Sequence, residues 1–161
     1  MKIISGCIYF IADKFFEKID DPYLKINYEF TKRPHYLALQ DIATSLYWLV
    51  PCSSKVEKFE HIIKQKQLNH KPTNGIKILI IRSRKTVLLF QDMFPIDEKY
   101  IEKQYIRDNE PVMIADTKIV AELERNAKKI ITLLRRGIKF TPTAPNIKHI
   151  EKLMLEEIIK E

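Results

Sequence analysis

The amino-acid sequence predicts an α+β fold, in which helices pack around an antiparallel sheet. Short runs rich in β-branched and aromatic residues recur through the first two thirds of the chain and end at turn residues. Two of these runs, 76–82 and 86–91, are joined by so few residues that they must pair antiparallel. Two helical patterns, 116–137 and 146–160, close the chain.

The N-terminal elements follow from composition and turn signals. Residues 3–11 predict a first strand, and residues 12–19 a short helix. The apolar runs 36–39 and 46–50 predict two paired strands. We expect Pro51 to end the second of them, because proline has no N–H to donate to a ladder.

A helix is expected over residues 55–68. Ser54 and Glu57 have the spacing of a capping box, in which each side chain bonds the other residue's backbone N–H. The apolar face of this helix consists of Val56, Phe59, Ile62 and Ile63.

The second half of the chain continues with the hairpin. Its strands are almost continuously apolar, which predicts that both are central in the sheet. Residues 97–105 predict a short helix, and residues 111–114 a last strand. The long helix begins after Asp116, a good N-cap, and ends at Gly137, a good residue to follow a helix.

The long helix has one apolar and one basic arc when it is projected at about 100° per residue. The apolar arc, which we expect in the core, contains Ile119, Leu123, Ala127, Ile130 and Leu134. The basic arc contains Arg125, Lys128, Lys129, Arg135 and Arg136. A basic arc is either a solvated face or a footprint for nucleic acid, and both interpretations stay open.

Length and charge bound the class of protein. The 161 residues fit one domain, residues 1–161. The formal net charge is +7 and the isoelectric point is about 9.3, which favours an acidic partner. Nucleic acid is the commonest partner of this kind, and an anionic membrane surface is the rival.

Cys7 and Cys52 are the only cysteines, so a zinc site or a disulfide scaffold is not expected. The four histidines lack metal-ligand spacing. The N-terminal apolar run resembles a signal peptide but is short and is followed at once by Asp13 and Lys14. Since no run is long enough to span a membrane, we expect a cytoplasmic protein.

The cations are concentrated in a few segments. Residues 77–85 contain four cations and no acid, whereas residues 92–110 contain six acids and three cations. This asymmetry is typical of one positive face that follows a phosphate backbone. Aromatic residues near these segments either stack on unpaired bases or belong to the core, and the core is expected for Trp48. The predicted RNA-binding residues are Tyr28, Lys32, Arg33, Lys58, Arg82, Arg84, Lys85, Arg125, Lys129 and Arg136.

The segment around Ser53 and Ser54 joins a strand to a helix N-terminus. Free N–H groups and the positive end of the helix dipole bind phosphate well at such a place, and Lys55 and Lys58 add charge. The alternative interpretation is that the serines only cap the helix, and capping statistics alone favour it.

Metal-free RNA cleavage does not require a nucleophile from the protein, because the ribose 2′-OH is the nucleophile. The protein must align that oxygen, offer donors to the phosphoryl oxygens and move two protons. Ser53, Ser54 and Lys55 form a suitable set, and His35 is a candidate for proton transfer. His35 is equally well interpreted as a turn residue after Pro34. The sequence contains no P-loop, no G-x-S-x-G and no H-E-x-x-H motif.

Three segments, 21–25, 32–36 and 50–55, resemble the toxins of type III toxin–antitoxin systems. This is the ToxN/AbiQ family, and the chain is most similar to its CptN- or TenpN-like branch. The resemblance implies a MazF/Kid-like fold, with a strongly bent antiparallel sheet of about five to six strands. It implies a metal-independent endoribonuclease that needs no cofactor and leaves 2′,3′-cyclic phosphate ends. The implied partner is a small repeat antitoxin RNA, whose pseudoknots form a closed assembly with the toxin and block its site. Such systems often protect bacteria against phage.

The resemblance also matches individual residues of this sequence to functional positions of the family. Ser53 matches the position where members have serine or threonine, and Ser54 matches the serine that follows. His35 stands where well-known members have a lysine, and Lys55 follows the serines directly, without the proline of ToxN. Either Lys55 or Lys58 therefore corresponds to the family's lysine, and the general base is left open. A non-catalytic RNA- or DNA-binding protein, and an interaction domain with a basic surface, are the alternative hypotheses.

Overall fold

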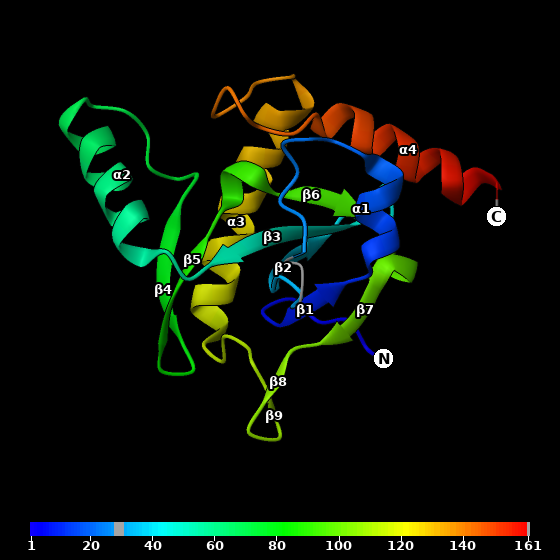
Figure 1. Ribbon diagram of the computed structural model, residues 1–161, viewed down its shortest axis with the longest axis horizontal. Coiled ribbons are helices and arrows are strands. Elements are labelled where there is room, and N and C mark those ends of the chain that lie inside the picture. Colours follow the sequence, from blue (N-terminus) through cyan, green and yellow to red (C-terminus); the bar gives the residue numbers. More distant parts are fainter. Residues whose placement is uncertain (28–30, 161) are drawn as a thin grey trace.

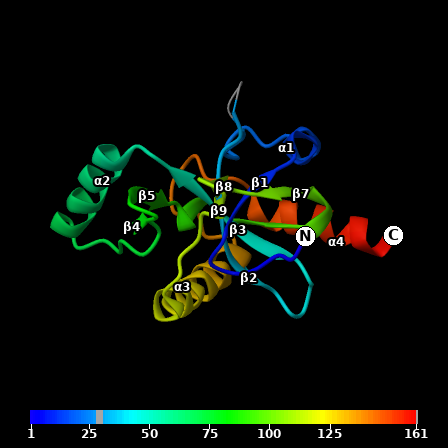
Figure 2. The same ribbon diagram turned by 90° about the horizontal axis from the view of Figure 1, so that it is seen from below.

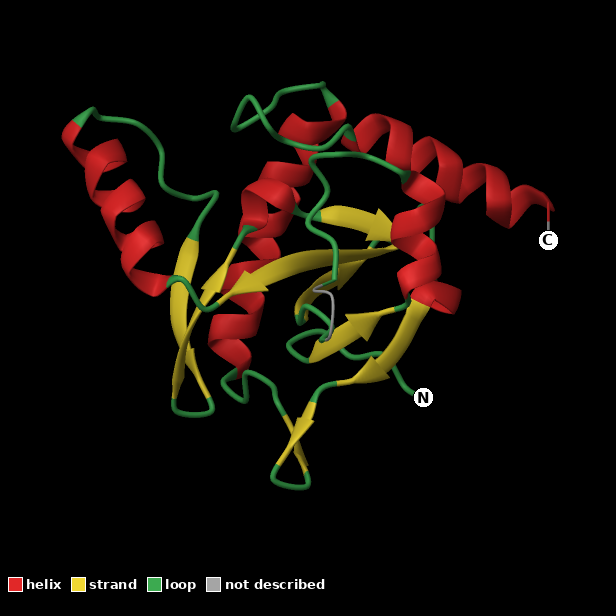
Figure 3. Ribbon diagram, viewed as in Figure 1, coloured by secondary structure: helices red, strands yellow, loops and turns green. Residues whose placement is uncertain are grey.

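The computed structural model describes residues 1–27 and 31–160, and its helices and strands are shown in Figures 1 and 3. The strands of the main sheet are β1 (Ile8–Ile11), β2 (His35–Gln40), β3 (Tyr47–Ser53), β4 (Lys77–Ile81), β5 (Arg84–Leu88), β6 (Phe94–Ile96) and β7 (Ile101–Gln104). A small hairpin is formed by β8 (Ile106–Arg107) and β9 (Glu110–Pro111). The α-helices are α1 (Asp13–Ile19), α2 (Val56–Leu68), α3 (Thr117–Arg135) and α4 (Ile147–Lys160). Two short 3₁₀ turns are Phe90–Asp92 and Glu98–Tyr100.

The predicted α+β class with an antiparallel sheet is confirmed. The described strands form one seven-stranded sheet in the order β4-β5-β3-β2-β1-β7, with β6 paired to β3. Every pairing in it is antiparallel. The sheet is bent, because β4 and β5 turn steeply away from the direction of β1, β2 and β3 (Figure 1). Figure 2 shows α1 and α3 on opposite sides of β1–β3.

Strand β3 changes partner along its length, and the predicted stop at Pro51 is wrong. On one edge of β3, Pro51 still lies opposite His35 of β2. On the other edge, β3 pairs with β6 through Tyr47–Leu49 and then with β5 through Cys52 and Ser53. The Pro51 carbonyl accepts a hydrogen bond from Leu89 N–H at 2.9 Å. The missing proline N–H therefore falls where the strand passes from one neighbour to the next, which is a place that a sheet tolerates.

Several other elements differ from the sequence prediction. The predicted helix over residues 97–105 is instead a 3₁₀ turn and strand β7, because Tyr100 and Ile101 are buried and β7 pairs with β1. Strand β4 lies at the edge of the sheet and not in its centre. The first strand begins at Ile8, and the expected last strand is reduced to β9 and an isolated bridge from Met113 to Cys7.

The main core fills the space between the sheet and helices α1, α3 and α4, and Trp48 is fully buried in it as expected. On α3, the predicted apolar arc is buried at Leu123, Ala127, Ile130 and Leu134. The Asp116 carboxylate caps α3 by accepting from Lys118 N–H at 2.9 Å. A smaller cluster under α2 consists of Phe59, Ile76, Val87 and Leu89. None of the described helices is both long and apolar enough to cross a membrane.

Arg135 joins three elements at one point. Its Nη2 lies 2.5 Å from Asp41 in the β2–β3 turn and 2.8 Å from Glu151 of α4. Its guanidinium lies 5.5 Å from the centre of the Trp48 ring. Burial alone would raise the pKa of Asp41, but hydrogen bonds from Arg135, Ala43 and Thr44 outweigh it and hold this pKa below 3.8. This member of the basic arc therefore stabilises the fold.

We expect Arg135→Ala to lower the free energy of unfolding by about 1–2 kcal/mol near neutral pH, because an ion-pair network and a cation–π contact are lost. A carboxylate with a depressed folded-state pKa stabilises the protein above its ordinary pKa and stops doing so as pH falls through the folded value. The deficit of the variant should therefore shrink in acid, which denaturant unfolding at several pH values would measure. Arg125→Ala, an exposed arginine of the same helix, is the control. A deficit that stays constant in acid would contradict this account.

Candidate active site

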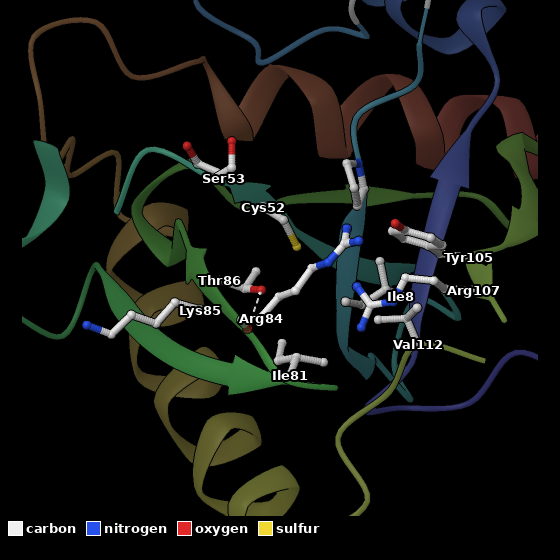
Figure 4. A pocket seen from close by; sticks show the side chains of 12 residues that line it. Ile8, Cys52, Ser53, Ile81, Arg84, Lys85, Thr86, Tyr105, Arg107 and Val112 are labelled. Atoms are coloured by element: carbon white, nitrogen blue, oxygen red, sulfur yellow. Dashed lines mark hydrogen bonds between the residues drawn. The ribbon is translucent and has the colours of Figure 1, made fainter. Parts of the chain in front are cut away.

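A pocket of about 220 Å³ lies where the two parts of the bent sheet meet (Figure 4). It is called the arginine pocket here. Its lining residues are Ile8, Pro34, Cys52, Ser53, Ser54, Ile81, Arg84, Lys85, Thr86, Tyr105, Arg107 and Val112. They come from β1, the segment before β2, the end of β3, the β4–β5 hairpin and the segment around β8 and β9. No single segment of the sequence makes this site.

Successive side chains of β5 point alternately toward the pocket and toward α2. Arg84 extends across the arginine pocket toward Tyr105 and Arg107, whereas Lys85 points the other way (Figure 4). The Lys85 Nζ lies 2.8 Å from Glu60 of α2. Successive side chains of a strand face opposite sides, so Arg84 crosses the pocket while Lys85, which lines its edge, directs its ammonium to Glu60.

A reciprocal contact between two arginines supports the far wall. The Arg82 Nη1 donates to the carbonyls of Arg107 at 2.6 Å and of Glu110 at 3.1 Å. In return, Nη2 of Arg107 donates to the Arg82 carbonyl. These bonds tie the β4–β5 turn to the β8–β9 hairpin. Arg82, predicted to bind RNA, therefore has a structural task and holds Arg107 at the pocket.

Ser53 and Ser54 lie at the rim, where β3 leads into α2. The Ser53 side chain is 9% exposed, and its Oγ accepts a hydrogen bond from Lys55 N–H at 3.2 Å. Helix α2 begins after Lys55 with no side-chain cap, so the predicted capping box of Ser54 and Glu57 does not form. Ser53 instead accepts from the N–H of Lys55, the residue before the helix, in a local turn, and the exposed Ser54 hydroxyl stays at the pocket.

Arg33 is half-buried and lies behind the turn that contains Ser53 and Ser54, called the serine turn here. Its Nη1 donates to the Cys52 carbonyl at 3.0 Å, and its Nε donates to the Ile26 carbonyl at 3.3 Å. The guanidinium therefore anchors the end of β3 to the segment that precedes β2. The guanidinium therefore places a positive charge beside Ser53, but Arg33 does not line the pocket itself.

The structure does not support the predicted role of His35 in proton transfer. His35 is fully buried in β2, between Phe16 and Phe94, and it does not line the arginine pocket. Its Nδ1 pairs with the Arg33 carbonyl at 2.9 Å, which can only accept, so Nδ1 carries the proton. Burial lowers the pKa of His35 to about 3. A neutral, enclosed imidazole cannot reach a substrate.

The other predicted residues are dispersed. Lys32 lies 2.8 Å from Glu102, and Lys58 lies over the Phe59 ring at 5.3 Å. Lys55 is exposed at the start of α2, and neither Lys55 nor Lys58 lines the arginine pocket. Arg125 and Lys129 of α3 are exposed, as is Arg136, which follows the helix. Tyr28 lies outside the described residues.

Sequence reasoning missed Thr86, Tyr105 and Arg107, which all line the pocket. Tyr105 and Arg107 lie in the stretch that is rich in acids, so the charge count pointed away from them. Interpreting residues 97–105 as a helix hid the strand that brings them beside β1. Among residues 1–27 and 31–160, no three His, Cys, Asp or Glu side chains gather as metal ligands would.

The fold is similar to that of a solved structure of AbiQ, described as a lactococcal anti-phage endoribonuclease of the type III toxin–antitoxin system. The match covers 98% of this chain and 100% of that chain, with a TM-score of 0.73 and 11% sequence identity. No protein-family model matches the chain, and no curated protein matches its sequence. The comparisons therefore define the class of fold, in agreement with the resemblance seen in three short segments.

The buried His35 predicts a specific pH dependence of stability. Between about pH 3 and 6.5 the unfolded state binds a proton at His35 that the native state does not, so stability rises with pH by up to about 1.4 kcal/mol per unit. We expect His35→Asn, whose amide can keep the bond to the Arg33 carbonyl, to remove this slope. Chemical denaturation across that pH range tests it, and an unchanged slope would assign the pH dependence to other groups.

Proposed function

We propose that this protein is a metal-independent endoribonuclease toxin of a type III toxin–antitoxin system. The observation that carries the proposal is the fold similarity to AbiQ over nearly the whole of both chains. The arginine pocket beside Ser53 and Ser54 supports it, because that place is where the resemblance in sequence puts the active site. On this proposal, residues 1–161 act as one cytoplasmic domain, and the CptN- or TenpN-like branch remains our preferred relative.

The proposed reaction is internal attack by RNA on its own backbone. The ribose 2′-oxygen forms a bond to phosphorus, and the bond from phosphorus to the 5′-oxygen breaks. The products are a 2′,3′-cyclic phosphate and a 5′-hydroxyl, so water is not consumed. One proton leaves the 2′-oxygen and one reaches the 5′-oxygen, while negative charge grows on the two non-bridging oxygens.

The residues of the pocket fit this reaction in distinct ways. Arg84 and Arg107 would bind the phosphoryl oxygens, since guanidinium groups stabilise the charge that develops there. The exposed hydroxyl of Ser54 and the N–H groups at the start of α2 would donate from the opposite rim. Ser53 would hold that turn in shape through its bond to Lys55 N–H. Lys55, which is exposed before α2 and follows Ser54 in the chain, would supply a proton to the 5′-oxygen.

We further propose that a small repeat RNA with pseudoknot units inhibits the protein by covering this site in a closed protein–RNA assembly, and that the system acts against phage. The net charge of +7 suits such a partner. Further exposed cations outside the pocket are Arg125 and Lys129 of α3 and Arg136 after it.

The alternative function is a non-catalytic RNA- or DNA-binding protein. The hydrogen bond from Lys55 N–H to Ser53 favours it, because this bond gives the Ser53 hydroxyl a structural task in the turn before α2. Binding without cleavage would then be the observed property.

The neighbouring cations of β5 provide a matched test. We expect Arg84→Ala to lower the cleavage rate on the order of a hundredfold, because one donor to the developing charge is lost. Lys85→Ala removes the same charge one residue away, where the side chain faces Glu60, and should change the rate only a few-fold. Purified proteins, single-stranded RNA and EDTA suffice for the measurement. Equal losses in both variants would indicate a general charge effect instead of a phosphoryl contact.

The serines are tested with the same assay and end-group analysis. Ser53→Ala should reduce cleavage on the order of a hundredfold or more, because loss of the bond to Lys55 N–H would displace the donors of that turn. Ser53→Thr, which keeps the hydroxyl, should retain most of the activity. The products of the wild type should carry cyclic phosphate and 5′-hydroxyl ends. Intact RNA after incubation with folded wild-type protein would favour the binding-protein alternative, and a fully active Ser53→Ala variant would contradict the role of Ser53.

A further inference from the structure

A second hollow adjoins the arginine pocket on the outer face of β1 and β7. It measures about 350 Å³ and is called the aromatic hollow here. Its lining residues are Phe10, Thr31, Lys32, Pro34, Lys103 and Tyr105. Pro34 and Tyr105 line both cavities, so the aromatic hollow borders the arginine pocket with its Arg84 and Arg107. In Figure 4, Tyr105 lies at the far side of the pocket from Ser53.

Two aromatic rings form the wall of this hollow. The ring centroids of Phe10 and Tyr105 are 5.1 Å apart, with an angle of 34° between the planes. Both residues remain partly exposed, although Tyr9 and Ile11 on either side of Phe10 are completely buried. The alternation of β1 explains this, since Tyr9 and Ile11 face the core while Ile8 and Phe10 face the two cavities.

Cations surround the rings on the solvent side. The Lys103 Nζ lies 5.8 Å from the centre of the Phe10 ring. Lys32, held 2.8 Å from Glu102, adds a second cation at the edge. An open aromatic pair that is flanked by lysines and lies next to a pocket with two arginines is suited to bind an unpaired nucleobase together with its neighbouring phosphates.

We infer that the Phe10–Tyr105 pair is a stacking subsite for one unpaired base of the RNA, next to the phosphate held by Arg84 and Arg107. This inference rests on the proposed function and deepens it, because it assigns the residues that choose which nucleotide borders the cut. The subsite positions the RNA strand and takes no part in proton transfer. Stacking accepts any base but favours those with the larger π surface, so purines should be preferred.

The test uses a fluorescent 2′-O-methyl oligoribonucleotide, which cannot be cleaved, with the sequence around a mapped cleavage position. A base–aromatic stack contributes about 1–3 kcal/mol, so Tyr105→Ala should raise Kd at least about fivefold. Tyr105→Phe, which keeps the ring, should bind within about twofold of the wild type. Tyr23→Ala removes an exposed tyrosine away from both cavities and is the matched control.

An abasic site in the oligonucleotide identifies the partner base. An abasic nucleotide on one side of the cleavage position should weaken wild-type binding about as much as Tyr105→Ala does, and should add little to the loss in that variant. Phe10→Leu, which keeps apolar volume without a ring, gives a second measurement if Tyr105→Ala does not fold, as judged by thermal unfolding.

The outcomes separate the two proposals. A wild type that cleaves no RNA in EDTA overturns the proposed function and the subsite with it. A wild type that cleaves, with variants at Tyr105 and Phe10 that bind as tightly as it does, overturns the subsite alone. Independent losses from Tyr105→Ala and from every abasic position would do the same, because stacked partners must be coupled.

Discussion

The rest of this structure depends on the change of partner within β3. Along one edge the strand pairs with β6 through Tyr47–Leu49 and then with β5 through Cys52 and Ser53, while β2 pairs with its other edge. A strand shared by two differently directed parts of a sheet forces the sheet to bend, and the bend leaves a depression at the junction. Proline suits this point because one backbone donor must lack a ladder partner there. The serine turn that follows is thereby held at the edge of the depression.

The depression receives its charge from hairpins instead of from the helix that the serines precede. Arg84 comes from the β4–β5 hairpin, and Arg107 comes from the β8–β9 hairpin. The two hairpins are held together by hydrogen bonds between Arg82 and Arg107 and the backbone carbonyls of the opposite segment. Five donors in a planar fork allow an arginine to do this while the hairpin remains exposed. Two arginines that are close in the chain thus have different tasks: Arg82 holds the hairpins together, and Arg84 lines the depression.

Net charge alone was a poor guide to the site. Arg135 binds Asp41 and Glu151, Lys85 binds Glu60, and Lys32 binds Glu102, so part of the positive charge is used within the fold. Conversely, Tyr105 and Arg107 come from the acidic stretch and still face the pocket. A charge count along the sequence averages over the two faces of each strand, whereas a substrate meets only one of them.

The sequence by itself determined the elements whose signals are local. Periodicity, helix-end residues and apolar runs predict four of them. These are the hairpin at residues 76–91, the helix between Asp116 and Gly137, the burial of Trp48 and the turn around Ser53. Only the tertiary structure decided what depends on distant neighbours. His35 is enclosed by Phe16 and Phe94. Pro51 continues a strand because β5 follows β6 along the same edge of β3. Residues 101–104 pair with β1 in a strand that buries Ile101. The site belongs to this second group, since its residues converge from five segments and none of those segments holds them together alone.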